Sequence, residues 1–509
     1  MIARLSAPFR RDARPPAARL LGAILCGAGI AMGQAPWGAW WLALIGLGAL
    51  AVLILAETRP VRAAWLGWAG GVGHFAAAMF WIVEPFLVDP DTYGWMAPFA
   101  LVFTATGLAL FWAFAGWMSA LWPGRACRAM GLVLGFGLAD LARSYVLTGF
   151  PWALIGHVWI DTPVAQLAAW FGPVGLSVLT VAVVILPLGA RDWSMRGLVT
   201  IPSVAVLALG WSLGLWRLAL PEVPRDRPIH VRLVQPDAEQ HLKWRADMWR
   251  LFLDRQMALS AKPSAVALDL IVWPETAVPF LLDGAEPFFE RLAGATGGVP
   301  VAVGIQREIG ARFYNSLAFA DGAGRVIDVY DKWHLVPFGE YVPLGDALAA
   351  FGLTAFAAQE GNGYSPGPGP RLIDLGRAGR VLPLICYEAV FPQDVRAAGD
   401  RPDWILQVTN DGWFGKIAGP YQHLAQARLR AIEQGLPLLR AANTGISAAI
   451  DGRGRVIDAL PLGAIGAIDV AVPAALPPTP YSRMGDWPMG ALLAFLLAAL
   501  AWRRSAKVH

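Results

Sequence analysis

The sequence predicts a polytopic α-helical membrane domain that carries one α/β domain outside the cytoplasm. Two observations lead to this fold class. Hydrophobic residues make up 56% of the 509 residues and charged residues only 15%, which is too apolar for an ordinary cytosolic protein. The polar residues gather in one long segment, residues 220–484. Most of the chain is therefore expected to lie in a bilayer, with one soluble domain attached.

Eight apolar segments are candidates for membrane-spanning helices, which need about 20 residues each. They cover residues 19–34, 37–56, 63–83, 96–121, 129–148, 164–189, 197–218 and 486–502. The first is short, but six further spans follow it without a convincing cleavage site, so we interpret it as a retained helix. The predicted domains are a membrane domain with seven helices (1–219), an α/β domain (220–484), and a final helix with a cytoplasmic tail (485–509).

The positively charged residues predict the orientation, because Lys and Arg favour cytoplasmic loops. They precede the first span, follow the last, and occupy every second loop, in which the arginines are Arg59, Arg62, Arg125, Arg128, Arg191 and Arg196. Arg143 and Arg217 break the pattern and are expected to snorkel to the interface from nearby span ends. This topology places residues 220–484 on the periplasmic face of the inner membrane of a Gram-negative bacterium.

Composition also argues against several kinds of site. The net charge is only +4 and the arginines form no basic stripe, so nucleic acid is not an expected partner. Cys26, Cys127 and Cys386 have no paired spacing, which predicts neither a disulfide framework nor a CxxC metal site. The run Gly361–Pro370 places proline where a phosphate-binding loop needs donors. We therefore expect no metal and no cofactor.

The polar segment has the pattern of a layered α/β domain. Short β-type runs alternate with helical stretches such as Tyr421–Gln434, and Asp451–Gly454 is typical of a hairpin turn. The predicted strands include His230–Gln235, Leu268–Trp273, Pro300–Ile305, Arg380–Ile385, Trp404–Val408 and Leu438–Ala442.

Three reactive side chains follow strand patterns in this domain. Cys386 and Glu275 each close a buried apolar run, and Lys332 follows the strand pattern Val326–Asp331. Open α/β sheets collect their active sites at the carboxyl ends of strands. A thiol that attacks a carbonyl group needs a base, and it needs a cation or donors for the oxyanion. Each residue alone has an ordinary structural explanation, but together they predict a nucleophilic site.

The surrounding motifs resemble those of the nitrilase superfamily, with its Glu-Lys-Cys triad. They are Trp273-Pro-Glu-Thr276, Tyr330-Asp-Lys-Trp-His334 and Ile385-Cys-Tyr-Glu388, followed by Asn410–Gly415, a helix with Gln422, His423, Arg430 and Glu433, and Arg440–Gly445. The resemblance implies an α-β-β-α sandwich. With seven spans before the domain and one after it, the chain is similar to the apolipoprotein N-acyltransferase family, which completes bacterial lipoprotein maturation.

The resemblance implies a catalytic triad and four supporting or substrate-binding residues. The triad is Glu275, Lys332 and Cys386, and the supporting residues are Trp244, Glu340, Tyr387 and Glu388. The implied reaction moves an acyl chain from a phospholipid, expected to be phosphatidylethanolamine, to a thioester on the cysteine. The chain then passes to the α-amine of the diacylglyceryl-cysteine at the N-terminus of an apolipoprotein. The stretch 344–356 is expected to be a lid, a membrane-dipping arm or a core helix.

Three other functions are compatible with the same sequence. The first is a membrane-anchored, nitrilase-like amidase that uses the triad to hydrolyse a small amide. The second is a scaffold or transporter built on the eight spans, in which Asp140, His74 and Arg143 are the main polar residues. The third is an acyltransferase of the same fold that acts on another amine or on a sugar.

Overall fold

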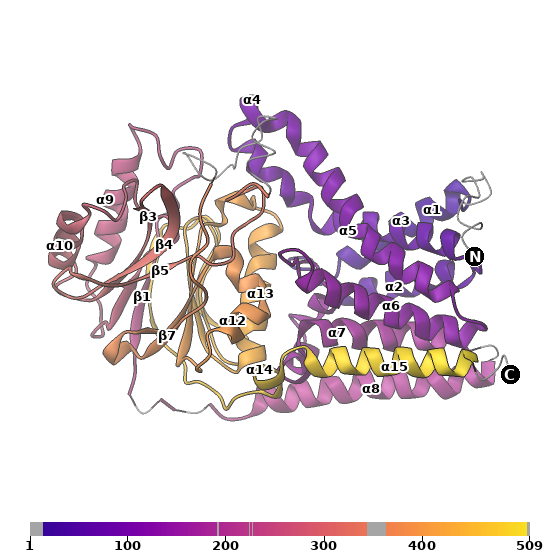
Figure 1. Ribbon diagram of the computed structural model, residues 1–509. Coiled ribbons are helices and arrows are strands. Elements are labelled where there is room, and N and C mark those ends of the chain that lie inside the picture. Colours follow the sequence, from indigo (N-terminus) through magenta and orange to yellow (C-terminus); the bar gives the residue numbers. More distant parts are fainter. Residues whose placement is uncertain (1–13, 191–192, 223, 226, 344–362, 506–509) are drawn as a thin grey trace. The chain divides into compact units, whose positions relative to one another are not determined.

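The computed structural model describes residues 14–190, 193–222, 224–225, 227–343 and 363–505. The chain divides into two compact units. A helical unit comprises residues up to Val83, Trp95–Ala219 and the residues from Met484 onward; an α/β unit comprises Glu84–Gly94 and Leu220–Arg483. In Figure 1 the α/β unit carries the strand arrows and the helical unit contains α1 to α3, α5 to α8 and α15. The predicted stretch 344–356 lies outside the described residues.

Helices of the helical unit coincide with all eight predicted apolar segments. They are α1 (Ala17–Ala31), α2 (Trp40–Leu55), α3 (Pro60–Ala78), α5 (Ala97–Ala120), α6 (Arg125–Tyr145), α7 (Ala168–Ile185), α8 (Trp193–Ala219) and α15 (Trp487–Ser505). Among the described residues, three helical stretches are long and apolar enough to cross a membrane: Pro90–Ala120, Pro163–Gly189 and Gly197–Ala219. A fourth would result if α3 and the 3-10 helix η2 (Phe80–Leu87), bent by 48°, form one broken span.

Glycine residues bring the backbones of α1, α3 and α5 into contact. A β-carbon at Gly73 of α3 would lie 2.0 Å from the carbonyl oxygen of Ile24 in α1. One at Gly67 of α3 would lie 2.2 Å from the carbonyl oxygen of Trp112 in α5. Small residues allow such close packing in a bilayer, where lipid tails are as apolar as the helices themselves. Any side chain at these two positions would force the helices apart.

The two arginines that break the charge pattern are buried. The guanidinium of Arg143 on α6 lies 3.2 Å from the carboxylate of Asp140 and donates to the carbonyl oxygen of Trp152 at 2.5 Å. Arg217 on α8 donates to the side chain of Gln166. The expectation that these arginines snorkel to the interface is therefore wrong, because both guanidinium groups are buried and find hydrogen-bond partners inside the unit.

The α/β unit is an α-β-β-α sandwich, which confirms the expected fold class. Its strands are β1 (His230–Gln235), β2 (Leu270–Val272), β3 (Val301–Ile309), β4 (Arg312–Ala320), β5 (Val326–Asp331), β6 (Ile373–Asp374), β7 (Arg380–Ile385), β8 (Trp404–Thr409), β9 (Leu438–Ala442), β10 (Ser447–Ile450), β11 (Val456–Leu460) and β12 (Gly466–Ala471). Among the described residues, the first sheet has the order β12-β1-β2-β3-β4-β5 and the second β11-β10-β9-β8-β7-β6. Three neighbouring strands run parallel in each sheet, β1-β2-β3 and β7-β8-β9.

Helices cover the outer face of each sheet (Figure 1). They are α9 (Trp249–Ser260) and α10 (Glu286–Ala295) on the first sheet, and α12 (Pro392–Ala397) and α13 (Gly419–Gln434) on the second. Phe289 of α10 packs in one apolar cluster with Val303 of β3, and Ala431 of α13 packs in another with Leu384 of β7. Burying a large apolar side chain contributes about 1.5–3 kcal/mol, so these clusters hold the layers together.

The strand predictions are confirmed where the pattern was an apolar run. The structure has β1, β7 and β9 with the predicted bounds, and the predicted turn Asp451–Gly454 joins β10 to β11. The sequence pattern does not reveal β4, which pairs along its whole length with β3. Its first half, Arg312–Asn315, is polar or aromatic and lacks a run of aliphatic residues. This omission matters because β4 carries part of the site.

Candidate active site

The three residues of the predicted triad follow the ends of three strands and are buried. Glu275 lies three residues after β2, Lys332 directly after β5, and Cys386 directly after β7. The first two come from one sheet and the third from the other. The ammonium of Lys332 lies 3.3 Å from the Glu275 carboxylate, and the charges of both residues act on the Cys386 thiol. The sandwich therefore brings the predicted triad together.

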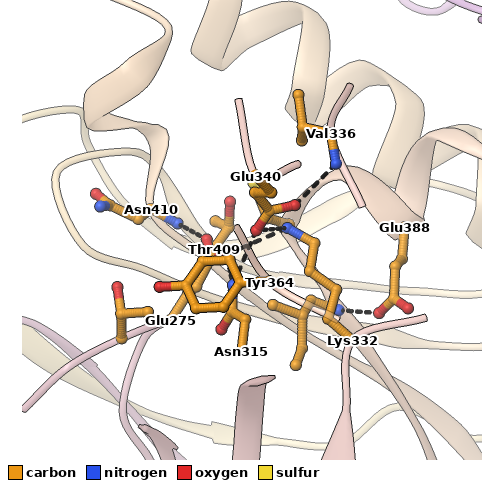
Figure 2. Close-up of polar contacts among 12 residues, drawn as sticks. Glu275, Asn315, Lys332, Val336, Glu340, Tyr364, Glu388, Thr409 and Asn410 are labelled. Atoms are coloured by element: carbon orange, nitrogen blue, oxygen red, sulfur yellow. Dashed lines mark hydrogen bonds and ion pairs between the residues drawn. The ribbon is translucent and has the colours of Figure 1, made fainter. Parts of the chain in front are cut away.

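Donors hold both carboxylate oxygens of Glu275 (Figure 2). Its Oε1 accepts hydrogen bonds from Asn315 Nδ2 at 2.7 Å and from Lys332 Nζ at 3.3 Å. Its Oε2 accepts a hydrogen bond from the backbone N–H of Asn410 at 2.8 Å. Asn315 comes from β4 of the first sheet and Asn410 follows β8 of the second. The position of this carboxylate therefore depends on both sheets.

The turn that carries Glu275 is constrained on several sides. Thr276 has φ +44°, which is rare for a β-branched residue. A β-carbon at Gly304 of β3 would lie 2.7 Å from the Cα atom of Glu275, so only glycine allows this approach. The buried ammonium of Lys243 donates to the carbonyl oxygen of Glu275 at 3.3 Å and to Thr276 Oγ1 at 3.0 Å. Burial lowers the pKa of Lys243 to about 7, against the opposing charge of Glu275.

Lys332 lies between two carboxylates (Figure 2). Its Nζ is 2.8 Å from Oε1 of Glu340 and 3.3 Å from Oε1 of Glu275. Burial alone would lower the pKa of Lys332, but the charges of Glu340 and Glu275 outweigh it and raise this pKa well above its ordinary value. Oε2 of Glu340 accepts from the backbone N–H of Val336 at 2.9 Å, which anchors the following loop. One ammonium thus faces two carboxylates.

Cys386 occupies a strained turn at the end of β7. It has φ +52°, a left-handed conformation unusual for a residue other than glycine, and it begins the 3-10 helix η8 (Cys386–Val390). Its carbonyl oxygen accepts from Gln407 Nε2 at 3.2 Å and lies 3.0 Å from His423 Nε2. Its thiol is hydrogen-bonded to the hydroxyl of Thr409. Both ends of the residue therefore have partners in the second sheet and its helix.

The environment of Cys386 favours the protonated thiol. Burial and the charge of Glu275 raise its pKa well above the ordinary value, and the charge of Lys332 opposes this only in part. A thiol with a raised pKa is not a preformed thiolate at neutral pH. Attack by this sulfur requires a base that removes the proton as the new bond forms.

Glu388 connects the loop after β5 with the end of β7. Its Oε1 accepts from the hydroxyl of Tyr330 at 2.8 Å and from the backbone N–H of Trp333 at 2.7 Å. Its Oε2 accepts from the backbone N–H of Ile385 at 2.6 Å. Burial raises the pKa of Glu388 to about 7, while these donors oppose the shift. The side chain thus ties the residue before Cys386 to the residue after Lys332.

The other two predicted supporting residues flank the site. The buried ring of Tyr387 packs edge-on against the rings of His334 and Phe391, with centroids 5.7 and 4.8 Å away. Trp244 is half-buried and lines a small pocket together with Lys243, on the side of the turn that carries Glu275.

Sequence reasoning missed four contacts of this site. Asn315 donates to the carboxylates of both Glu275 and Glu340, at 2.7 and 3.1 Å. Asn315 lies where β4 changes from polar to apolar residues, so a prediction of β4 would have drawn attention to this side chain. Thr409, the backbone of Asn410, and Lys243 beside Trp244 were also missed. Their roles depend on contacts between segments far apart in the chain.

Comparison with known families assigns both parts of the chain. Residues 230–478 match the carbon-nitrogen hydrolase family, and residues 26–186 match the apolipoprotein N-acyltransferase N-terminal domain. Among solved structures, the chain is similar to a CN-hydrolase superfamily protein from Xanthomonas campestris, with 20% identity and a TM-score of 0.36 over 49% of this chain and 92% of that one. A mutant amidase from Nesterenkonia sp. AN1 has 20% identity and a TM-score of 0.37 over 53% and 99%.

Curated relatives match nearly the whole chain, and each of those described here is named apolipoprotein N-acyltransferase. The protein from Rhodopseudomonas palustris is 36% identical over 96% of this chain and 95% of the relative. The one from Brucella melitensis is 36% identical over 94% of each chain. The one from Caulobacter vibrioides is 37% identical over 91% of each.

Proposed function

The chain belongs to the apolipoprotein N-acyltransferase family, and we propose that Cys386 is the nucleophile of its acyl transfer, with Glu275 as the general base and Lys332 as the cation that stabilises the oxyanion. One observation carries this proposal. The carboxylates of Glu275 and Glu340 share the ammonium group of Lys332. The base and the cation are thus fixed beside each other in a buried site, and the charges of both act on the Cys386 thiol.

The other functions compatible with the sequence are not favoured. Relatives matched over more than nine-tenths of their length carry the acyltransferase name, whereas a small-amide hydrolase would need only the α/β unit. The transporter alternative relied on polar residues inside the spans. Arg143 and Asp140 are instead paired with each other.

In the first step, the thiol of Cys386 attacks the ester carbonyl of a phospholipid, for which we propose phosphatidylethanolamine. The thiol proton passes to Glu275 as the sulfur–carbon bond forms. Lys332, kept charged by its carboxylates, stabilises the negative charge that develops on the carbonyl oxygen. When the ester carbon–oxygen bond breaks, Glu275 returns the proton to the leaving lysophospholipid oxygen, and the acyl chain remains on Cys386 as a thioester.

In the second step, the neutral α-amine of a diacylglyceryl-cysteine at the N-terminus of an apolipoprotein attacks this thioester. Glu275 accepts a proton from the amine as the nitrogen–carbon bond forms. The carbon–sulfur bond then breaks, and the sulfur of Cys386 takes the proton back from Glu275. The product is an N-acylated lipoprotein, and the enzyme returns to its starting state.

Four further residues support this cycle in our proposal. Glu340 holds Lys332 beside the base, and Glu388 fixes the loop that follows Lys332. Tyr387 and Trp244 contact the substrates from the two sides of the site. Since none of these four exchanges a proton with the acyl group, their loss should slow the reaction less than loss of a triad residue.

We propose that the α/β unit lies in the periplasm, attached to the inner membrane. Both lipid substrates have acyl chains that stay in the bilayer, so the site must be reached from the membrane. A reporter fused within residues 220–484 should behave as periplasmic, and one fused after Lys507 as cytoplasmic. The reverse result would invert the proposed topology.

Incubation with phospholipid alone tests the two-step mechanism. The full-length enzyme in detergent should release at most one lysophospholipid per molecule and keep the acyl group on the Cys386 peptide, which mass spectrometry detects. Addition of a diacylglyceryl-cysteine peptide should then discharge the thioester to its amine. Continuous release of lysophospholipid and free fatty acid without this acceptor would identify water as the acceptor and refute the transferase mechanism.

A further inference from the structure

A second buried charge cluster lies beside Cys386 and is formed by three motifs for which the acyl transfer has no use. We call it the Asp411 cluster. It consists of Asp411 after β8, His423 on α13 and Arg440 on β9, whose side chains are all 0% exposed. One Asp411 oxygen accepts from Arg440 Nη2 at 2.5 Å, and the other lies 3.0 Å from His423 Nδ1. Three separate segments of the second sheet and its helix therefore meet in one network.

The Asp411 cluster reaches Cys386 at two points. His423 Nε2 lies 3.0 Å from the carbonyl oxygen of Cys386, beside the amide of Gln407, which donates to the same oxygen. The hydroxyl of Thr409 donates to Asp411 Oδ1 at 3.0 Å and is hydrogen-bonded to the Cys386 thiol. Backbone and sulfur of the nucleophile are thus connected to the same carboxylate.

The backbone of Cys386 needs such a restraint. Its φ of +52° is unfavourable for a side chain with a β-carbon, and strained conformations persist only where the surroundings over-determine them. The Gln407 amide of β8 donates to the carbonyl group, and His423 of α13 lies against the same amide on one side of the strained residue. Without them the turn could relax, and the direction of the thiol would change with it.

The charges of the cluster select one protonation state of the histidine. Burial and the charge of Arg440 lower the pKa of His423, against the opposing influence of Asp411, so the ring is neutral at neutral pH. A neutral ring with its proton on Nδ1 donates to Asp411 Oδ1 at 3.0 Å, and its Nε2 accepts from the side-chain amide of Gln407, which lies 3.1 Å away. The other tautomer would direct the Nδ1 lone pair at the Asp411 carboxylate and the Nε2–H at the amide group of Gln407.

We propose that His423 is a positioning residue for the nucleophile: held by Asp411, it accepts at Nε2 from the Gln407 amide that donates to the Cys386 carbonyl, and so maintains the left-handed turn that aims the thiol at the acyl carbonyl. This inference rests on the proposed role of Cys386. His423 acts through the backbone of Cys386, whereas Glu275 acts on its proton.

The test measures the reactivity of the thiol in the full-length protein in detergent. Iodoacetamide labels Cys386, and peptide mass spectrometry separates its labelling from that of Cys26 and Cys127. His423→Leu should slow both this labelling and thioester formation from phospholipid by about 10–100-fold, the scale expected for a misplaced reacting group. His423→Gln, whose side-chain oxygen can accept from the Gln407 amide, should recover most of the rate, and KM for phospholipid should change little.

Two further variants separate positioning from general stability. Arg232→Met removes another buried arginine of the α/β unit, which pairs with Asp469 and with carbonyl groups of residues 260 and 262. It should lower the unfolding temperature and leave Cys386 labelling unchanged. Thr409→Val removes the hydroxyl between Asp411 and the thiol with little change of shape, and it should slow labelling while Thr409→Ser does not. The Thr409 pair decides the matter if His423→Leu fails to fold.

Two outcomes would overturn the inference. One is wild-type labelling of Cys386 in folded His423→Leu and Thr409→Val. The other is labelling that falls only as far as the loss of stability predicts, with no recovery in His423→Gln. Failure of the proposed function gives a different result, namely continued acyl transfer by Cys386→Ala, which needs no His423 variant to detect.

Discussion

The two buried charge clusters beside Cys386 differ in their balance of charge. We call the first the Glu275 cluster; it comprises Glu275, Glu340 and Lys332. It follows strands of the first sheet and sets two carboxylates against one ammonium. The Asp411 cluster belongs to the second sheet and sets one carboxylate against one guanidinium. The first has a surplus negative charge and the second has none.

The comparison shows that burial of a charged side chain is not by itself evidence of a catalytic group. Burial alone would raise the pKa of Asp411, but Arg440 and His423 lower it to about 2, so this carboxylate has no tendency to take a proton at neutral pH. The surplus carboxylate of the Glu275 cluster instead acts on the thiol and raises its pKa. In our proposals, the first cluster moves a proton and the second holds the turn at Cys386.

The largest expected effect comes from removing the sulfur between the clusters. Cys386→Ala should abolish acyl transfer and thioester formation, because both steps pass through this atom. The measurement is lysophospholipid release and acylation of a diacylglyceryl-cysteine peptide by the full-length protein. Cys127→Ala, on α6 of the helical unit, is the matched control and should keep its activity. Acyl transfer by a well-folded Cys386→Ala protein would be incompatible with a cysteine nucleophile.

Glu275→Gln tests whether the first cluster works as a base. The amide keeps the shape of the side chain but cannot accept the thiol proton, so thioester formation should slow by about 10²–10⁴-fold, the range for general base catalysis. Lys332→Met should slow the same step through the oxyanion. Single-turnover release of lysophospholipid measures both. Rates near wild type in both variants would show that the triad is misassigned.

Glu340→Gln converts the Glu275 cluster into a balanced pair like the Asp411 cluster. Lys332 would then lose one of its two carboxylate partners, which lies 2.8 Å away and helps to raise its pKa, so the cation would be held less firmly for the oxyanion. We expect thioester formation to slow roughly tenfold, the scale of a slightly misplaced catalytic group. The matched control is Glu433→Gln on α13, a buried carboxylate paired with Arg430. Equal loss of activity in both variants would contradict the importance of the surplus charge.

The smallest effect concerns Glu388, which belongs to neither cluster. Its pKa is raised from 4.5 to about 7 by burial, so the folded state holds this proton more tightly than the unfolded state does. The resulting stabilisation is fully present below pH 4.5 and is lost as the pH rises to about 7. It amounts to about 3 kcal/mol at most. Glu388→Gln should flatten the dependence of the unfolding temperature on pH between 5 and 8, and unchanged slopes would refute this assignment.

The sequence alone determined the elements and the chemistry at their ends. Apolar length located the helices, and short apolar runs located β1, β7 and β9, because burial leaves a periodic trace in the local sequence. The run of β7 ended at Cys386 and that of β2 at Glu275, so the reactive groups were recognisable without knowledge of their neighbours. Local periodicity also explains the failure at β4, whose first half carries no such trace.

Which of these groups act on one another depends on the packing of the fold. Segments that are distant in the chain meet at both clusters. In the first, two carboxylates share Lys332 and the Asn315 amide donates to both of them. In the second, Asp411 contacts His423 and Arg440. A residue's neighbours along the chain indicate whether it is buried, but the charges that set its pKa come from other strands and helices, and those are placed by the packing of the whole fold.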